Sequence, residues 1–234
     1  INNKLYWNER ENSLSGVSKL MRSDINSFNE ELVLNVPFNE IEDIHVLRDT
    51  NLIFFRSDRY IYNNANGSVN YIADCQGNAG GYNMCVDEIN GYIYKFGTYY
   101  QTPMLYRCNL DGSNQVQLAN GYSGLEPQAC FFDYVNNRIY FSTGSYIYYY
   151  DVATDSYNSI NFPNTGYQST NVNQLIAYDL TSSNPRIMWS SEAAGAVYSV
   201  NFDGTSYMIN ITDPNTYGLS LIDSTSQTGI FHEL

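Results

Sequence analysis

The segment GYIYKFG at Gly91–Gly97 decides the fold, because five other stretches of the chain repeat its pattern. Each opens on a turn-forming or polar residue, continues with a pair of strand-forming residues and ends in polar residues. The other five are KLYWNE (Lys4–Glu9), NLIFFRS (Asn51–Ser57), NRIYFST (Asn137–Thr143), PRIMWSS (Pro185–Ser191) and TGIFHEL (Thr228–Leu234). Their central pairs begin at residues 5, 53, 93, 139, 187 and 230, so the intervals are 48, 40, 46, 48 and 43 residues. Regular spacing of this size indicates a repeat architecture, because one unit buries its apolar face only against its neighbours.

Each repeated segment is the second of four expected strands, which we name A, B, C and D in chain order. Strand A is an apolar run that ends at or near an aspartate: Ile44–Asp49, Met84–Asp87, Cys130–Asp133, Leu175–Asp179 and Leu219–Asp223. Strand C ends in a tight turn: Lys19–Asn26, Arg59–Gly67, Met104–Gly112, Ser145–Asp155 and Ala196–Gly204. A short strand D follows, as at Gln115–Leu118 and Tyr207–Ile211. Four antiparallel strands in about 45 residues are typical of the blades of a β-propeller.

The repeats resemble the YWTD repeats of the low-density-lipoprotein-receptor family propeller and of related extracellular and bacterial proteins. The resemblance covers essentially the whole chain and rests on the pairs Tyr6-Trp7, Ile93-Tyr94, Ile139-Tyr140 and Met188-Trp189. It is closest where strand C reads like L-Y-R-x-N-L-D-G, at Leu105–Gly112 and Val197–Gly204. The Thr-Asp ending of the family repeat is never reproduced, so the bonds of that Asp are not carried over. The resemblance implies a shared architecture and binding of a protein ligand outside the cell.

The number of blades stays open between six and five. Six B strands stand against five A strands and five C–D pairs. Six blades, which the B-strand count and the family slightly favour, lack the first A strand and the last C and D strands. Alternatively, Leu219–Asp223 supplies strand A of the amino-terminal blade, which closes five blades and leaves Gly229–Leu234 over. Such closure protects sheet edges that an open ring exposes.

Composition indicates an acidic, all-β protein rich in tyrosine, with 23 tyrosines among 234 residues. We expect one propeller domain over residues 1–234. The net charge of −13 repels nucleic-acid phosphates and anionic lipid surfaces, and no apolar run approaches the roughly 18 residues that span a bilayer. Because the chain begins at Ile1 without a leader-like segment, either a leader has been removed or the chain is part of a longer protein.

Four cysteines, Cys75, Cys85, Cys108 and Cys130, suggest two disulfides and an oxidising compartment, although four buried thiols are the alternative. Cys85 and Cys108 lie in strands A and C of one unit, about two strand spacings apart and beyond disulfide reach. The pairing Cys75–Cys85 with Cys108–Cys130 is therefore preferred. The spacing contains no metal-binding motif, so we expect neither a metal nor another cofactor. The sequons at Asn66 and Asn210 are compatible with secretion.

The loops point to one face of the ring as the binding face. Alternating strand directions place the B–C and D–A connections on one face and the A–B and C–D connections on the other. The D–A links are long, whereas the A–B and C–D connections are short, and binding groups concentrate on loops that a rigid scaffold holds. The candidate ligand-binding residues on the long-loop face are Glu9, Arg10, Tyr99, Tyr100, Tyr122, Glu126, Tyr167, Glu192 and Tyr217. Their alternative role is to pack between blades or to cover loop backbone.

Two other repeated features favour structural roles. Tyr146, Tyr148 and Tyr150 share one face of a strand C, which predicts packing between blades rather than a functional stripe. The aspartates that end strand A could line a channel and bind a cation, but a role in the A–B turn is preferred. These aspartates are Asp49, Asp87, Asp133, Asp179 and Asp223.

Catalytic motifs are scarce, which argues against an enzyme. GxSxG, GxGxxG, P-loop and HExxH patterns are absent, and the histidines His45 and His232 both lie inside expected strands. We therefore favour a secreted or surface-exposed, non-catalytic module that binds a protein ligand through the long-loop face. A carbohydrate-binding propeller is the first alternative, and a glycoside hydrolase with a carboxylate pair is the second.

Overall fold

A computed structural model describes the following residues of the chain: 4–10, 16–24, 27, 29–38, 41, 43–47, 50, 52–57, 60–74, 83–99, 102–120, 127, 129–143, 146–160, 174–178, 185–191 and 196–212. These residues form 19 β-strands and one short 3-10 helix, η1 (Ala65–Gly67). None of the helical segments in this part of the chain is long and apolar enough to cross a membrane.

The strands form five antiparallel sheets. The first contains β1 (Lys4–Arg10), β2 (Ser18–Asp24) and β3 (Glu30–Val36). The second contains β4 (Ile44–Val46), β5 (Ile53–Ser57), β6 (Tyr60–Asn63) and β7 (Asn70–Asp74). The third contains β8 (Asn83–Asp87), β9 (Tyr92–Tyr99), β10 (Thr102–Asn109) and β11 (Val116–Asn120). The fourth contains β12 (Ala129–Asp133), β13 (Arg138–Thr143), β14 (Tyr146–Asp151) and β15 (Ser156–Ile160), and the fifth contains β16 (Gln174–Tyr178), β17 (Arg186–Ser191), β18 (Ala196–Asn201) and β19 (Met208–Thr212).

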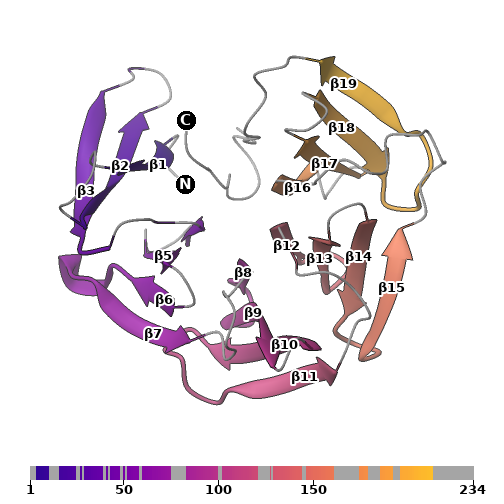
Figure 1. The fold of residues 1–234 in the computed structure, drawn as a ribbon, viewed down its shortest axis with the longest axis horizontal. Coiled ribbons are helices and arrows are strands. Elements are labelled where there is room, and N and C mark those ends of the chain that lie inside the picture. Colours follow the sequence, from indigo (N-terminus) through magenta and orange to yellow (C-terminus); the bar gives the residue numbers. More distant parts are fainter. Residues whose placement is uncertain are drawn as a thin grey trace.

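The five sheets are the blades of a β-propeller arranged around a central axis (Figure 1). In the second to fifth blades, the A strands β4, β8, β12 and β16 lie nearest the axis, and the D strands lie at the outside. The prediction of an all-β propeller with four-stranded antiparallel blades is confirmed. The described residues make five blades, the alternative that the sequence left open, and not the slightly favoured six.

The first blade contains three described strands, β1 to β3, which occupy positions B, C and D. Its position A is the one that Leu219–Asp223 would fill in the five-blade reading of the sequence. That segment and Gly229–Leu234 lie outside the described residues, so the mode of ring closure stays a prediction.

The hydrophobic core lies between neighbouring blades, because residues of a strand alternate between the two faces of its sheet. Cys85, Tyr94 and Phe96 of the third blade pack against Phe132 and Phe141 of the fourth. Equivalent clusters join the first and second blades, the second and third, and the fourth and fifth. Each blade therefore depends on its neighbours for burial, as the repeat spacing predicts.

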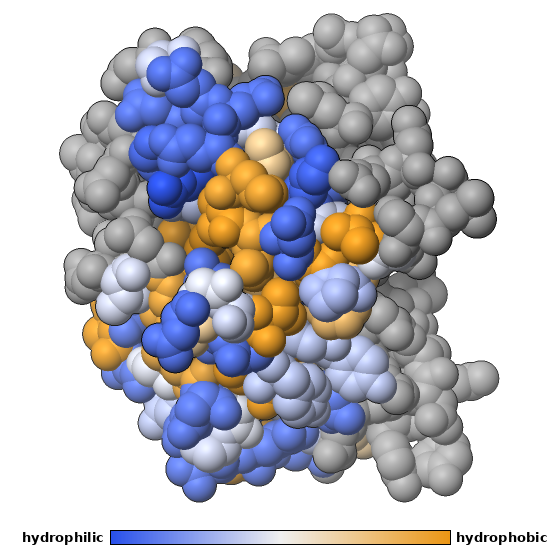
Figure 2. Space-filling model, turned by 90° about the vertical axis from the view of Figure 1, so that its left-hand side faces the viewer, coloured by the Kyte–Doolittle hydropathy of each residue, from blue (hydrophilic) through white to orange (hydrophobic). Residues whose placement is uncertain are grey.

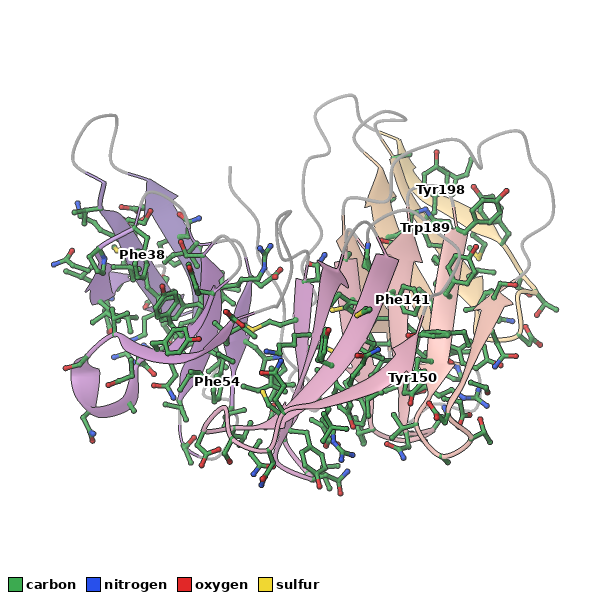
Figure 3. The ribbon with its side chains drawn as sticks, turned by 60° about the horizontal axis from the view of Figure 1, so that its bottom comes forward. Phe38, Phe54, Phe141, Tyr150, Trp189 and Tyr198 are labelled. Atoms are coloured by element: carbon green, nitrogen blue, oxygen red, sulfur yellow. The ribbon has the colours of Figure 1, made fainter. Side chains whose placement is uncertain are left out.

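A cross-strand aromatic pair recurs where strand B meets strand C. Phe55 stacks on Tyr62 at 5.8 Å between ring centroids, Phe141 on Tyr148 at 5.7 Å, and Trp189 on Tyr198 at 5.5 Å. Figure 3 shows the last two of these blades, with Phe141, Trp189 and Tyr198 labelled. In each case the strand B residue lies two positions after the first isoleucine of the strand, and it is directly opposite the tyrosine.

The tyrosine-rich strand β14 packs as the sequence predicts. Tyr150 belongs to the cluster between the third and fourth blades, and Tyr148 packs against that cluster. Ile147 and Tyr149 face the fifth blade instead. Tyr146, at the beginning of the strand, is 54% exposed. Packing between blades therefore accounts for Tyr148 and Tyr150, whereas Tyr146 does not share it.

Candidate functional site

The two ends of the propeller differ in how their polar groups are satisfied. We call the end that carries the B–C and D–A connections the long-loop face, and the end that carries the A–B and C–D connections the turn face. The antiparallel order of every blade places all connections of one kind at the same end.

Aspartates close the A–B connections on the turn face. Asp133 Oδ1 accepts hydrogen bonds from the backbone N–H groups of Val135 (2.9 Å) and Asn136 (3.1 Å), and Asn136 Nδ2 donates to Asp133 Oδ2 (2.7 Å). Asp87 makes the same three bonds in its own turn, with Ile89 and Asn90. The predicted turn role is confirmed for these two aspartates. The equivalent residues Asp49, Asp179 and Asp223 lie outside the described residues.

The C–D connections of the third and fifth blades close in a second repeated way. The backbone N–H and the hydroxyl of Ser113 both donate hydrogen bonds to Asp111 Oδ1, at 2.9 Å and 2.6 Å. These bonds hold the pKa of Asp111 below its usual range. The turn from Asn201 to Thr205 repeats the arrangement, with Asp203 as the acceptor. The polar groups of these turns therefore bond within the turns themselves.

On the long-loop face, buried and partly buried side chains bond to the chain where it enters or leaves a blade. Asn8 Nδ2 of β1 donates to the carbonyl oxygen of Ile41 (2.7 Å), just before β4 begins. Two residues further, Asp43 Oδ2 accepts a hydrogen bond from Arg56 Nε of β5 at 2.7 Å. The side chains of this ion pair are only 6% and 8% exposed. The end of the link into the second blade is therefore fixed at two points.

The same arrangement holds the links on either side of the third blade. Asn83 Nδ2, at the start of β8, donates to the carbonyl oxygen of Pro127 (2.9 Å), just before β12. The ammonium group of Lys95, in β9, donates a hydrogen bond to the carbonyl oxygen of Asp74, the last residue of β7. Asn83 and Lys95 are both buried. Because these partners are backbone atoms of the links, the scaffold restrains the ends of the long loops.

The predicted ligand-binding residues fall mostly on parts of the chain that are not described. Glu9 lies near the long-loop end of β1, where its carboxylate accepts a hydrogen bond from Trp7 Nε1 at 3.4 Å. Arg10 and Tyr99 end β1 and β9 on the same face, and their side chains are not among those described. The remaining six lie outside the described residues: Tyr100, Tyr122, Glu126, Tyr167, Glu192 and Tyr217.

The predicted disulfide pairs are wrong for the three described cysteines, Cys85, Cys108 and Cys130, which are buried free thiols. Cys108 faces the second blade and Cys130 faces the third, so the sheet of the third blade lies between them. Cys85 packs in the same cluster as Cys130 rather than bonding to Cys75, which lies outside the described residues. Burial, followed by a hydrogen bond with Cys85, raises the pKa of the Cys130 thiol.

No three described His, Cys, Asp or Glu residues gather closely enough to hold a metal ion. His45 lies in β4, as the sequence predicts, with Nε2 3.4 Å from Glu88 Oε1, and His232 lies outside the described residues. Of the predicted glycosylation sites, Asn66 is exposed in η1, between β6 and β7 on the turn face. Asn210 lies in β19, and glycosylation of either residue stays a prediction.

Sequence reasoning missed the anchors of the long-loop face, which are the partly buried Asn8 and the buried residues Asp43, Arg56, Asn83 and Lys95. A signal for two of them was present. Arg56 and Lys95 each interrupt the apolar part of a B strand, in IFFRS and YIYKF. Aligning the B strands on their first isoleucine shows that Lys95 takes the position of Phe55, Phe141 and Trp189.

The outer side of the first two blades carries a cluster of aromatic side chains, of which Tyr71 is exposed and the others are partly buried. Phe38 contacts Tyr62 with ring centroids 4.5 Å apart, and Tyr60, Tyr62 and Tyr71 lie within 6.4 Å of one another. Tyr71 is 57% exposed. Figure 2 shows this side of the molecule, where apolar side chains gather in the middle of the surface between polar groups. We call Phe38, Tyr60, Tyr62 and Tyr71 the outer aromatic surface.

Comparison with known proteins identifies the fold and leaves the ligand open. No protein-family model and no curated protein matches this sequence. A chain in the crystal structure of the nidogen/laminin complex is similar over 92% of this chain and 77% of its own length, with a TM-score of 0.73 and 13% identity. TolB from Acinetobacter baumannii is similar over 88% of this chain and 52% of its own length, with a TM-score of 0.68 and 14% identity. The resemblance to YWTD-type propellers is thus confirmed at the level of the fold.

Enzymes share the architecture as well. An oligogalacturonate lyase in complex with manganese is similar over 89% of this chain and 62% of its own length, with a TM-score of 0.55 and 9% identity. The fold alone therefore does not separate a binding module from a catalyst, because one scaffold carries unrelated functions.

Proposed function

We propose that this chain is a non-catalytic propeller module that binds a protein ligand outside the cell through its long-loop face. The observation that carries the proposal is the set of anchors under that face, of which Asp43, Arg56, Asn83 and Lys95 are buried and Asn8 is partly buried. Asn8, the Asp43–Arg56 pair, Asn83 and Lys95 restrain the points at which long loops meet the blades. Loops with restrained ends lose less conformational freedom on binding, which favours affinity.

The turn face offers less for a ligand to contact. The aspartates of its turns already accept hydrogen bonds from their own turns. Similarity to a chain of the nidogen/laminin complex supports the same direction, since that structure is a complex of two proteins. The chain's net charge of −13 favours a partner with a basic contact surface.

The test is an affinity capture of extracellular proteins with the chain as bait, followed by binding measurements on purified candidates. Glu9→Lys together with Tyr99→Ala alters the long-loop face, and we expect it to weaken binding by at least tenfold. Ile89→Lys is the matched control, because Ile89 is 71% exposed on the turn face. It should bind like the unaltered chain.

Two outcomes would contradict the proposal. Loss of binding in Ile89→Lys, with retention in the long-loop variant, would move the site to the turn face. Loss of binding in Tyr71→Ala alone would move it to the outer aromatic surface. A glycan array run in parallel separates the carbohydrate alternative, since specific glycan binding without a protein partner would replace this proposal.

A further inference from the structure

Lys95 breaks the most regular contact in the propeller. In three blades the strand B residue two positions after the first isoleucine is aromatic and stacks on the tyrosine opposite it. In the third blade that position is Lys95, and the residue opposite is again a tyrosine, Tyr106. The ammonium lies 5.9 Å from the centroid of the Tyr106 ring. In the third blade a cation–π contact thus replaces the stacked pair of aromatic rings.

The Lys95 side chain is fully buried, with 0% of its surface exposed. It faces the second blade, as Ile93 two residues earlier does. Its ammonium donates to the carbonyl oxygen of Asp74 on that blade. Cys108 lies close enough for the charge to oppose the rise in thiol pKa that burial causes. The charge therefore lies within the packed interface between two blades.

The fold itself does not require this charge. An aromatic ring fills the same position in the second, fourth and fifth blades, and burying an ammonium costs free energy that an aromatic ring does not. What Lys95 contributes, and a ring cannot, is a hydrogen bond to Asp74. Asp74 is the residue at which the chain leaves β7 for the long-loop face. The link that starts there, residues 75–82, ends at Asn83, whose side chain holds the next link at Pro127.

We propose that Lys95 is a positioning residue of the long-loop face, whose buried ammonium fixes the Asp74 carbonyl at the end of β7, where the chain enters that face. This inference rests on the proposed function for its biological meaning. The claim that the Lys95 ammonium restrains the chain at Asp74 can be measured without any ligand.

The decisive variant is Lys95→Phe, which restores the aromatic pair of the other blades and removes the ammonium. Lys95→Met keeps a long unbranched stem without the charge, and it covers the case in which the phenylalanine does not fit. Phe55→Leu is the matched control, because it weakens the equivalent pair in the second blade and leaves the Lys95–Asp74 bond in place.

Hydrogen–deuterium exchange of the 75–82 peptide is the primary readout, and urea unfolding reports global stability. We expect both Lys95 variants to exchange roughly tenfold faster in that peptide, because a buried hydrogen bond to a charged group restrains it. Lys95→Phe should unfold at the same or a higher urea concentration than the unaltered chain. Phe55→Leu should unfold at lower urea, with exchange of the 75–82 peptide unchanged relative to the rest of the third blade.

Unchanged exchange of residues 75–82 in both Lys95 variants would overturn the inference, and so would equal acceleration throughout the third blade with loss of stability. The second result would make Lys95 a core residue only. Once a protein partner is purified, Lys95→Phe should weaken its binding about tenfold while the fold is retained. Failure to find a partner would count against the proposed function, whereas the exchange result would still decide the role of Lys95.

Discussion

The buried ion pair between Asp43 and Arg56 gives the sharpest prediction about the stability of the long-loop face. Arg56 Nε lies 2.7 Å from Asp43 Oδ2, and the side chains are 8% and 6% exposed. The backbone N–H of Arg56 also donates to the carbonyl oxygen of Asp43 at 3.0 Å. The perturbation is Asp43→Asn, which keeps the shape of the side chain and removes its charge.

The expected cost follows from the burial of the two charges. At this separation, with an effective dielectric constant of about 20, the attraction is about 6 kcal/mol, and desolvation of both groups offsets much of it. Removing one charge leaves the guanidinium desolvated without its carboxylate. We therefore expect the free energy of unfolding to fall by about 3–5 kcal/mol. Replacing both residues, as Asp43→Leu with Arg56→Met, should restore stability to within about 1–2 kcal/mol of the unaltered chain.

The assay is urea unfolding followed by circular dichroism, and the single variants Asp43→Leu and Arg56→Met complete a thermodynamic cycle with their double variant. A loss below about 1 kcal/mol for Asp43→Asn would refute the reasoning, because such a value is typical of exposed pairs. Additive losses in the double variant would refute it as well, since they would mean that the two side chains do not act together.

Three further predictions concern single structural features. Gly112→Ala should destabilise the chain by several kcal/mol more than Gly91→Ala: both glycines have positive φ, but only at Gly112 would a Cβ lie 2.0 Å from the carbonyl oxygen of Ile72. A loss of stability in Gly91→Ala as large as that in Gly112→Ala would contradict this. The three described cysteines should be alkylated by iodoacetamide without reduction, but only after unfolding; resistance after unfolding would show disulfides instead. Burial raises the pKa of several tyrosines, so their contribution to stability is complete below about pH 10 and is lost as the pH rises further. A spectrophotometric titration should therefore show part of the tyrosine ionisation delayed until alkaline unfolding, and complete ionisation near pH 10 would disprove it. These tyrosines are Tyr94, Tyr140, Tyr150 and Tyr157.

The strands were predictable because their signals are local. The segment Asn137–Thr143 contains β13, and the run Met84–Asp87 lies within β8. Strand-forming pairs bounded by Asn, Asp and Gly specify a strand and its turn without knowledge of the rest of the chain. The number of blades was harder to predict, because it depends on whether the two ends of the chain complete one sheet. That is a relation between segments more than 200 residues apart.

The anchors of the long-loop face were missed for a different reason. A lysine or arginine in a β-strand ordinarily lies on a solvent-exposed face, so the residue type alone does not mark Lys95 and Arg56 as buried. Both are buried because each reaches a backbone or carboxylate partner on a neighbouring connection. The turn aspartates Asp87 and Asp133 were predictable, since their partners are two and three residues away. The partners of Asn8 and Asn83 are 33 and 44 residues away.

This contrast in bonding range supports the long-loop face as the proposed ligand site. In a turn whose polar groups bond to one another, as Asp111 and Ser113 do, the turn's own geometry constrains its sequence. We expect that residues 75–82 can change without loss of the fold, as long as Lys95 keeps Asp74 in place. Substitutions within residues 75–82 should therefore alter binding with little effect on unfolding. Substitution of Asn83 should affect both, because loss of its side-chain amide leaves the Pro127 carbonyl oxygen without this donor.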